Sequence, residues 1–132
     1  CQVLMMRLKS DLLEIVDCAT KNKTNKLKIE WAEKSSITIV LCANGYPSSY
    51  IKNSEIKNLP DLKMDKNNQI FHAGTYEKNN KIYSIGGRVL SIAASSENLI
   101  DARQVCFNII KKINWKDGFF RKDIGWRIID NK

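Results

Sequence analysis

Several residue patterns that would assign a function directly are absent from this chain of 132 residues. The four cysteines are far apart and form no Cys-x-x-Cys pair, so the sequence indicates neither a zinc site nor a thioredoxin-like motif. Cys18, Cys42 and Cys106 have apolar neighbours, as is typical of small buried residues in a reducing cytoplasm. No apolar run approaches the roughly 20 residues of a membrane-spanning helix, and no signal peptide opens the chain. We therefore expect a cytoplasmic protein that does not enter a membrane.

Histidine and arginine are also scarce. His72 is the only histidine, and a lone histidine on a predicted strand is more often a hydrogen-bonded structural residue than a catalyst or a ligand. The formal net charge of +8 comes mainly from lysines, which are scattered among asparagines in loops such as residues 21–26. The charge keeps a stand-alone basic nucleic-acid-binding module as an alternative function. Because the lysines are scattered, we expect no nucleic-acid partner.

Length and composition indicate one globular domain over residues 1–132. A chain of this size can bury a core without disulfides or metals. Its hydrophobic content of 43% and charged content of 27% are those of a soluble globular protein. The first residue is Cys1 instead of methionine. We therefore expect a piece of a longer protein, with informative chemistry upstream.

The N-terminal third predicts a helix and a short extended segment. Apolar residues recur at helical spacing over residues 3–19 with charged residues between them, which predicts one amphipathic helix. A polar loop over residues 20–26 ends it. Residues 27–31 then alternate between apolar and polar side chains. This predicts a short strand or extended segment, with Trp31 packing inward.

A central strand and an irregular connection follow. Residues 37–43 are β-branched and almost continuously apolar, which predicts a strand buried on both faces or lying at the centre of a sheet. Asn44-Gly45 and Pro47 then predict a turn. The two tyrosines of this turn, Tyr46 and Tyr50, either pack over the end of the strand or line a cleft, and packing is favoured. Residues 52–68 are polar and irregular and carry no chemical signal.

Residues 69–94 hold the most informative pattern, two or three strands with special residues at their ends. The run Lys78-Asn79-Asn80-Lys81 predicts a tight hairpin, because asparagine tolerates positive φ. Gly86-Gly87-Arg88 at a strand entry indicates a candidate anion site, where exposed amides and a guanidinium meet a phosphate or carboxylate. The alternative is a plain bulge or turn, with Arg88 on the surface paired with an acidic side chain.

The last third predicts a helix and a docked tail. Residues 95–97, Ser-Ser-Glu, predict a serine N-cap and an acidic first turn. The helix stripe expected in the core is Leu99, Ala102, Cys106, Ile109 and Ile113. Residues 113–127 are rich in aromatic residues and glycine, so this segment should dock onto the domain. Three of its charged residues, Arg121, Asp123 and Arg127, either pair with one another or face a cleft. Helix, strands, helix and tail in this order indicate an α+β fold.

Five blocks in sequence resemble the C-terminal domain of the phosphoribosylamine-glycine ligases, also called glycinamide ribonucleotide synthetases, which are ATP-grasp enzymes. The blocks are residues 6–12, 45–47 with Tyr50, 71–75, 86–90 and 120–127. The resemblance implies a small mixed, largely antiparallel sheet with flanking helices, of the rudimentary hybrid-motif type. Ser48 and Ser91 replace glycines that the family usually has, which puts only the local backbone in doubt.

The resemblance also implies a reaction and its cofactors. The family joins 5-phosphoribosylamine and glycine, using ATP and magnesium, through a glycyl phosphate, to make glycinamide ribonucleotide in purine biosynthesis. Its ATP-grasp body, N-terminal domain and magnesium motif precede the residue that matches Cys1. This chain alone is therefore expected to bind no ATP or magnesium and to catalyse nothing. Its partners would be the missing domains and their small-molecule substrates.

By the same resemblance, the chain supplies one wall of the active site and no catalytic or metal-binding residue. The residues expected to face the cleft are His72, Gly74, Thr75, Gly87 and Arg88, with Arg88 as the phosphate partner. Arg7 and Asp123 are weaker candidates and are expected to form structural pairs between the first helix and the tail. A third possibility is a structural lid that only packs against neighbouring domains.

Overall fold

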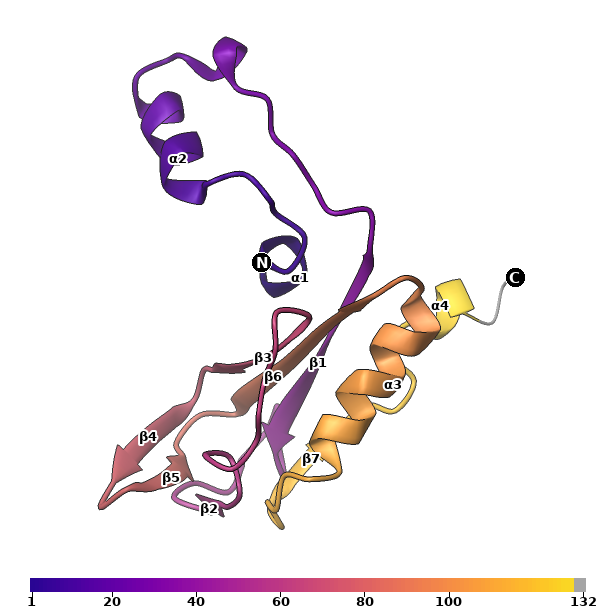
Figure 1. Ribbon diagram of the computed structural model, residues 1–132. Coiled ribbons are helices and arrows are strands. Elements are labelled where there is room, and N and C mark those ends of the chain that lie inside the picture. Colours follow the sequence, from indigo (N-terminus) through magenta and orange to yellow (C-terminus); the bar gives the residue numbers. More distant parts are fainter. Residues whose placement is uncertain (130–132) are drawn as a thin grey trace.

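The computed structural model describes residues 1–129, without the side chain of Lys26, and contains two antiparallel sheets and one packed helix (Figure 1). One sheet has four strands in the order β3-β6-β1-β7, and the other has three in the order β2-β5-β4. Every strand pair within the described residues is antiparallel. The predicted α+β class is confirmed, although the strands divide between two sheets instead of forming one.

The centre of the larger sheet is the pair β1 (Ser35–Ala43) and β6 (Arg88–Ser96). Along β1, alternate residues from Ile37 to Ala43 are buried, and the residues between them are only half-buried. The predicted central strand is therefore confirmed, but one of its faces is buried and the other is partly open. The outer strands are β3 (Asn68–His72) beside β6 and β7 (Gly118–Phe120) beside β1.

Helix α3 (Leu99–Ile110) covers the buried face of this sheet. Ala102, Cys106 and Ile109 are buried in the core as the stripe predicts. Burial raises the pKa of the Cys106 thiol to about 12. The predicted serine N-cap is wrong, because β6 continues to pair with β1 through Ser96. Asn98 caps the helix instead, and its side-chain oxygen accepts a hydrogen bond of 2.9 Å from the Asp101 amide.

The smaller sheet contains the predicted hairpin. Strands β4 (Thr75–Lys78) and β5 (Lys81–Ser84) are joined by Asn79 and Asn80, with φ of 53° and 58°, the geometry of a two-residue type I′ turn. Strand β2 (Glu55–Ile56) pairs with β5, so the connection over residues 52–68 is more ordered than expected.

The two sheets meet at a corner built from glycines. The predicted strand run over residues 69–75 is interrupted between His72 and Thr75, so its halves belong to different sheets. At this corner, a Cβ on Gly74 would lie only 2.6 Å from the Cα of Gly86. The close approach of these two backbones is what lets the chain pass from one sheet to the other.

The N-terminal segment differs most from expectation. The predicted single helix is two helices, α1 (Gln2–Met5) and α2 (Leu12–Thr20), followed by the short 3₁₀ helix η1 (Thr24–Lys26). Asp11 starts α2 by accepting a hydrogen bond of 2.7 Å from the Leu13 amide. Neither α-helix has a buried residue, and α2 lies away from both sheets (Figure 1). Trp31 is 42% exposed, so its predicted inward packing is wrong.

The C-terminal segment docks as predicted. Trp115 is 8% exposed, β7 pairs with β1, and the short helix α4 (Trp126–Ile129) follows. The Trp115 indole donates a hydrogen bond of 3.1 Å to the Ser54 hydroxyl, which donates one of 2.6 Å to the Asp117 carboxylate. These bonds fix the loop before β2 against the segment that leads into β7. Among residues 1–129, no helix is long and apolar enough to cross a membrane.

A candidate anion-binding cleft

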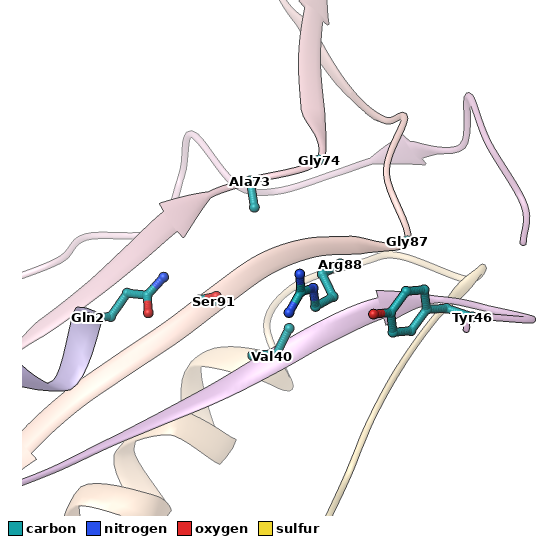
Figure 2. A pocket seen from close by; sticks show the side chains of 8 residues that line it. All are labelled: Gln2, Val40, Tyr46, Ala73, Gly74, Gly87, Arg88 and Ser91. Carbon is teal, nitrogen blue, oxygen red and sulfur yellow. The ribbon is translucent and has the colours of Figure 1, made fainter. Parts of the chain in front are cut away.

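A cleft of about 620 Å³ opens on the larger sheet, on the face opposite α3 (Figure 2). Val40 of β1 and Ser91 of β6 are paired there and alternate with the core residues Leu41 and Leu90. The N-terminal end of α1 approaches the same face, and its first residue, Gln2, lines the cleft. The lining residues are Gln2, Val40, Tyr46, Ala73, Gly74, Gly87, Arg88 and Ser91.

A β-bulge directs Arg88 into this cleft. Leu41 pairs with Leu90, but Cys42 pairs with Arg88, so Val89 is an extra residue in β6. Side chains alternate along a regular strand, which would place Arg88 on the core face together with Leu90. The extra residue reverses this, and Arg88 shares the cleft face with its partner Cys42. The bulge lies at Val89 and not at Gly86-Gly87, and Arg88 has no acidic partner among residues 1–129, so the alternative of a surface arginine paired with a carboxylate is wrong.

Backbone hydrogen bonds hold this corner in place. The Gly87 carbonyl accepts a hydrogen bond of 2.8 Å from the Ala43 amide, and the Arg88 carbonyl accepts one of 3.1 Å from the Gly74 amide. The Gly86 amide donates to the Gly74 carbonyl at 3.2 Å. Two other stretches of chain, at Ala43 and at Gly74, therefore fix the backbone from which the Arg88 side chain projects.

The Arg88 guanidinium makes no hydrogen bond or ion pair with any side chain or carbonyl of residues 1–129. None of the residues that line the cleft within that range carries a carboxylate. Burial raises the pKa of the opposite thiol, Cys42, and the charge of Arg88 only partly offsets this, so the thiol stays neutral near pH 7. The cleft thus carries a positive charge whose hydrogen-bond donors are available to an anion.

The other arginines have contacts inside the described chain. Arg7 donates through Nε and Nη2 to the Ala32 carbonyl, at 3.2 and 3.0 Å. Arg103 donates to the Lys122 carbonyl and lies over the Phe107 ring. The remaining two are Arg121, paired with Asp123, and Arg127, which lies 5.6 Å from the centre of the Trp126 ring.

Three of the five predicted site residues, Gly74, Gly87 and Arg88, line the cleft. His72 and Thr75 do not. The His72 ring shares a hydrogen bond of 2.9 Å with the Thr75 hydroxyl, as expected of a structural histidine. His72 is paired with Leu90, so it points to the opposite face of β3, where it lines a separate cavity of about 180 Å³. The structure therefore does not bring these two residues together with Arg88.

The expected pairing of Arg7 and Asp123 between the first helix and the tail is wrong. Arg7 is bonded within the N-terminal segment, and Asp123 accepts a hydrogen bond of 3.0 Å from Arg121 Nε. That bond lowers the pKa of the Asp123 carboxyl and raises the pKa of Arg121. The predicted pairing within the tail is confirmed for these two side chains.

Tyr46 lines the cleft but was not among the predicted site residues. Its ring rests on Gly87, where a Cβ would lie 2.1 Å from Cδ2 of the ring. Packing and cleft lining were considered as alternatives, and the structure shows both. The available signal was a Gly-Tyr-Pro turn after a central strand, with two glycines on the partner strand. Ser91, a departure from the family pattern, also lines the cleft.

The chain is similar over its whole length to curated ligases. It is 41% identical to the phosphoribosylamine–glycine ligase of Agrobacterium fabrum over 129 residues, which cover 98% of this chain and 30% of that protein. It is 41% identical to the chloroplastic phosphoribosylamine–glycine ligase of Arabidopsis thaliana over 134 residues, 100% of this chain and 25% of that protein. The chain therefore spans between a quarter and a third of the length of these relatives.

A solved structure agrees with this similarity. The crystal structure of phosphoribosylamine–glycine ligase from Thermotoga maritima matches 83% of this chain with a TM-score of 0.63 and 27% identity, and the match covers 27% of that chain. The family described as "Phosphoribosylglycinamide synthetase, C domain" matches residues 36–127, which include every lining residue of the cleft except Gln2. This chain belongs to the phosphoribosylglycinamide synthetase C-domain family.

Proposed function

We propose that this chain forms the C-terminal domain, residues 1–132, of an enzyme that joins 5-phosphoribosylamine and glycine at the expense of ATP. The products are glycinamide ribonucleotide, ADP and phosphate, in de novo purine biosynthesis. Relatives named for this ligation match the chain over its whole length, which supports the proposal. The alternative of a stand-alone nucleic-acid-binding module is not favoured by these relatives.

The Arg88 cleft is the part of the chain that we assign to this reaction, as one wall of the active site. The observation that carries the assignment is a guanidinium without a partner in residues 1–129, in a cleft without carboxylates. Such a guanidinium can hold two oxygens of a phosphate or carboxylate at once. Ligation through an activated carboxylate depends on positioning and on neutralising phosphoryl charge, and Arg88 contributes both. No residue of the chain is assigned to proton transfer.

The cofactors are proposed for the whole enzyme. Within residues 1–129, no three His, Cys, Asp or Glu side chains converge in a way that would hold a metal ion. We therefore assign no magnesium ligand to these residues and place the metal site in the rest of the enzyme. Gly74, Gly87 and Arg88 suit an anionic group of a substrate or of ATP. We assign His72 and Thr75, which lie outside the cleft, to a different part of the ligand.

The test is a pair of arginine variants in the intact protein that carries this chain. Arg88→Ala should raise the KM for 5-phosphoribosylamine or for ATP roughly 10- to 100-fold, the size of hydrogen bonds to a charged group. Its thermal stability should stay unchanged, because the side chain is exposed. Arg121→Ala is the matched control, since that exposed guanidinium pairs with Asp123 and is not among the residues that line the cleft. Wild-type KM values in Arg88→Ala would leave the purely structural lid as the better account.

A further inference from the structure

The Tyr46 ring is held firmly beside Arg88. One side of the ring rests on Gly87, which is buried and leaves room for it only because it lacks a Cβ. Tyr50 meets the ring at 6.2 Å between centroids and an angle of 64°, an edge-on contact. The Tyr46 amide also donates to the Ala43 carbonyl at 3.1 Å. The position of the hydroxyl is thus set by packing and not by a hydrogen bond of its own.

That hydroxyl has no hydrogen-bond partner among residues 1–129. Figure 2 shows it on the side of the ring that faces Arg88 and Val40, across the mouth of the cleft. A tyrosine with a partly buried ring usually places its hydroxyl against a polar group. Two neighbouring donors, the Tyr46 hydroxyl and the Arg88 guanidinium, therefore face the same space, and neither makes a hydrogen bond to residues 1–129.

We propose that Tyr46 is a second anion-binding residue of the cleft, whose hydroxyl donates to an oxygen of the group that Arg88 holds. This inference rests on the proposed function of the Arg88 cleft and deepens it. A planar guanidinium reaches two oxygens of a tetrahedral phosphate, and a donor from a second direction reaches a third. A carboxylate has only two oxygens, so three convergent donors favour a phosphate.

The size and charge of the cleft fit a phosphate monoester. Its volume of about 620 Å³ is that of a small-molecule site and exceeds what a free inorganic ion needs. The Gln2 amide and the Ser91 hydroxyl line the rest of the wall and suit the hydroxyl groups of a sugar. The chemical class that the geometry selects is therefore a phosphorylated polyol, bound by its phosphate at Arg88 and Tyr46.

The experiment compares three variants of the intact protein, Tyr46→Phe, Arg88→Ala and the control Tyr50→Phe. Tyr50 also presents a half-buried ring but does not line the cleft. Inorganic phosphate and acetate serve as probes at fixed ionic strength. Their binding is followed by the amide resonances of Gly74 and Gly87, so that only this site is observed.

We expect Tyr46→Phe to weaken phosphate binding roughly tenfold, the effect of one lost hydrogen bond to a charged group, and to leave acetate binding nearly unchanged. Tyr50→Phe should bind both probes as the wild type does, and Arg88→Ala should bind neither. Wild-type phosphate binding in Tyr46→Phe, together with loss in Arg88→Ala, would overturn the role of Tyr46 and leave the Arg88 site standing. Unchanged binding in Arg88→Ala would overturn both.

Discussion

Replacing Gly87 with alanine is expected to destabilise the protein by displacing the Tyr46 ring. A Cβ at position 87 would lie 2.1 Å from Cδ2, 2.7 Å from Cε2 and 3.1 Å from Cγ of that ring. Contacts this short do not occur, so the ring or the strand must move. Gly87 does not have a positive φ, so the backbone conformation that favours glycine over alanine is absent here. The whole penalty is therefore steric.

The loss in the free energy of unfolding depends on whether the strand or the Tyr46 ring moves to relieve the clash. Retreat of the strand would break the bond between the Gly87 carbonyl and the Ala43 amide, which is worth about 1 kcal/mol. Movement of the ring would disturb its contact with Tyr50. Overpacking of a buried site costs about 1–3 kcal/mol. Alanine also restricts the unfolded chain, which offsets about 0.4–1 kcal/mol. We expect a net loss of about 2 kcal/mol.

A double-mutant cycle measured by urea unfolding isolates the contact. Tyr46→Ala removes the obstacle, so adding Gly87→Ala to that variant should be neutral or slightly stabilising. The two changes should then be coupled by about 2–3 kcal/mol. Gly74→Ala is the matched control, because its Cβ would meet backbone atoms of Gly86 and Arg88 at 2.6–2.8 Å, which Tyr46→Ala cannot relieve. Additive costs of Gly87→Ala and Tyr46→Ala would refute the reasoning.

Two further predictions concern the core. Ser54→Ala removes the acceptor of the Trp115 indole and should lower the free energy of unfolding by about 1–2 kcal/mol. Ser48→Ala, at an exposed serine, is the control. Equal urea midpoints for the two variants would contradict this prediction. The raised pKa of Cys106, about 12, keeps its thiol protonated at pH 8, so a disulfide reagent should modify the exposed Cys1 promptly and Cys106 only on unfolding. Prompt modification of Cys106 in the folded protein would be the opposite result.

The parts of the fold that the sequence predicts are those set by short-range patterns. The stripe of α3 and the asparagine turn at Asn79-Asn80 each depend on a few neighbouring residues. The turn is confirmed, and the stripe is confirmed except that the helix ends at Ile110, before the predicted Ile113. The same reasoning failed over residues 3–19, where the apolar spacing suits one helix but Asp11 caps a second one. An apolar stripe predicts burial only when another element covers it, and nothing within residues 1–129 buries this one.

The candidate site shows the same limit. Gly86-Gly87-Arg88 has a local signature, and the sequence identified it. The bulge at Val89 depends on pairing with β1, and the contact of Tyr46 with Gly87 joins two segments that are remote in the sequence. The position of His72 depends on which face of β3 it occupies, and that is decided by its pairing with Leu90. The register between two strands cannot be predicted from the sequence of either strand alone.

The direction in which Arg88 points depends on how many residues separate it from Leu90, and not on which residue stands at position 89. Replacing Val89 with another apolar residue keeps the count, and the guanidinium of Arg88 stays in the cleft. Deleting it restores plain alternation and turns the guanidinium toward the packed layer beneath α3, where an unpaired charge costs several kcal/mol. Among descendants of this sequence, apolar substitutions at Val89 should therefore persist far more often than single-residue insertions or deletions between Arg88 and Leu90.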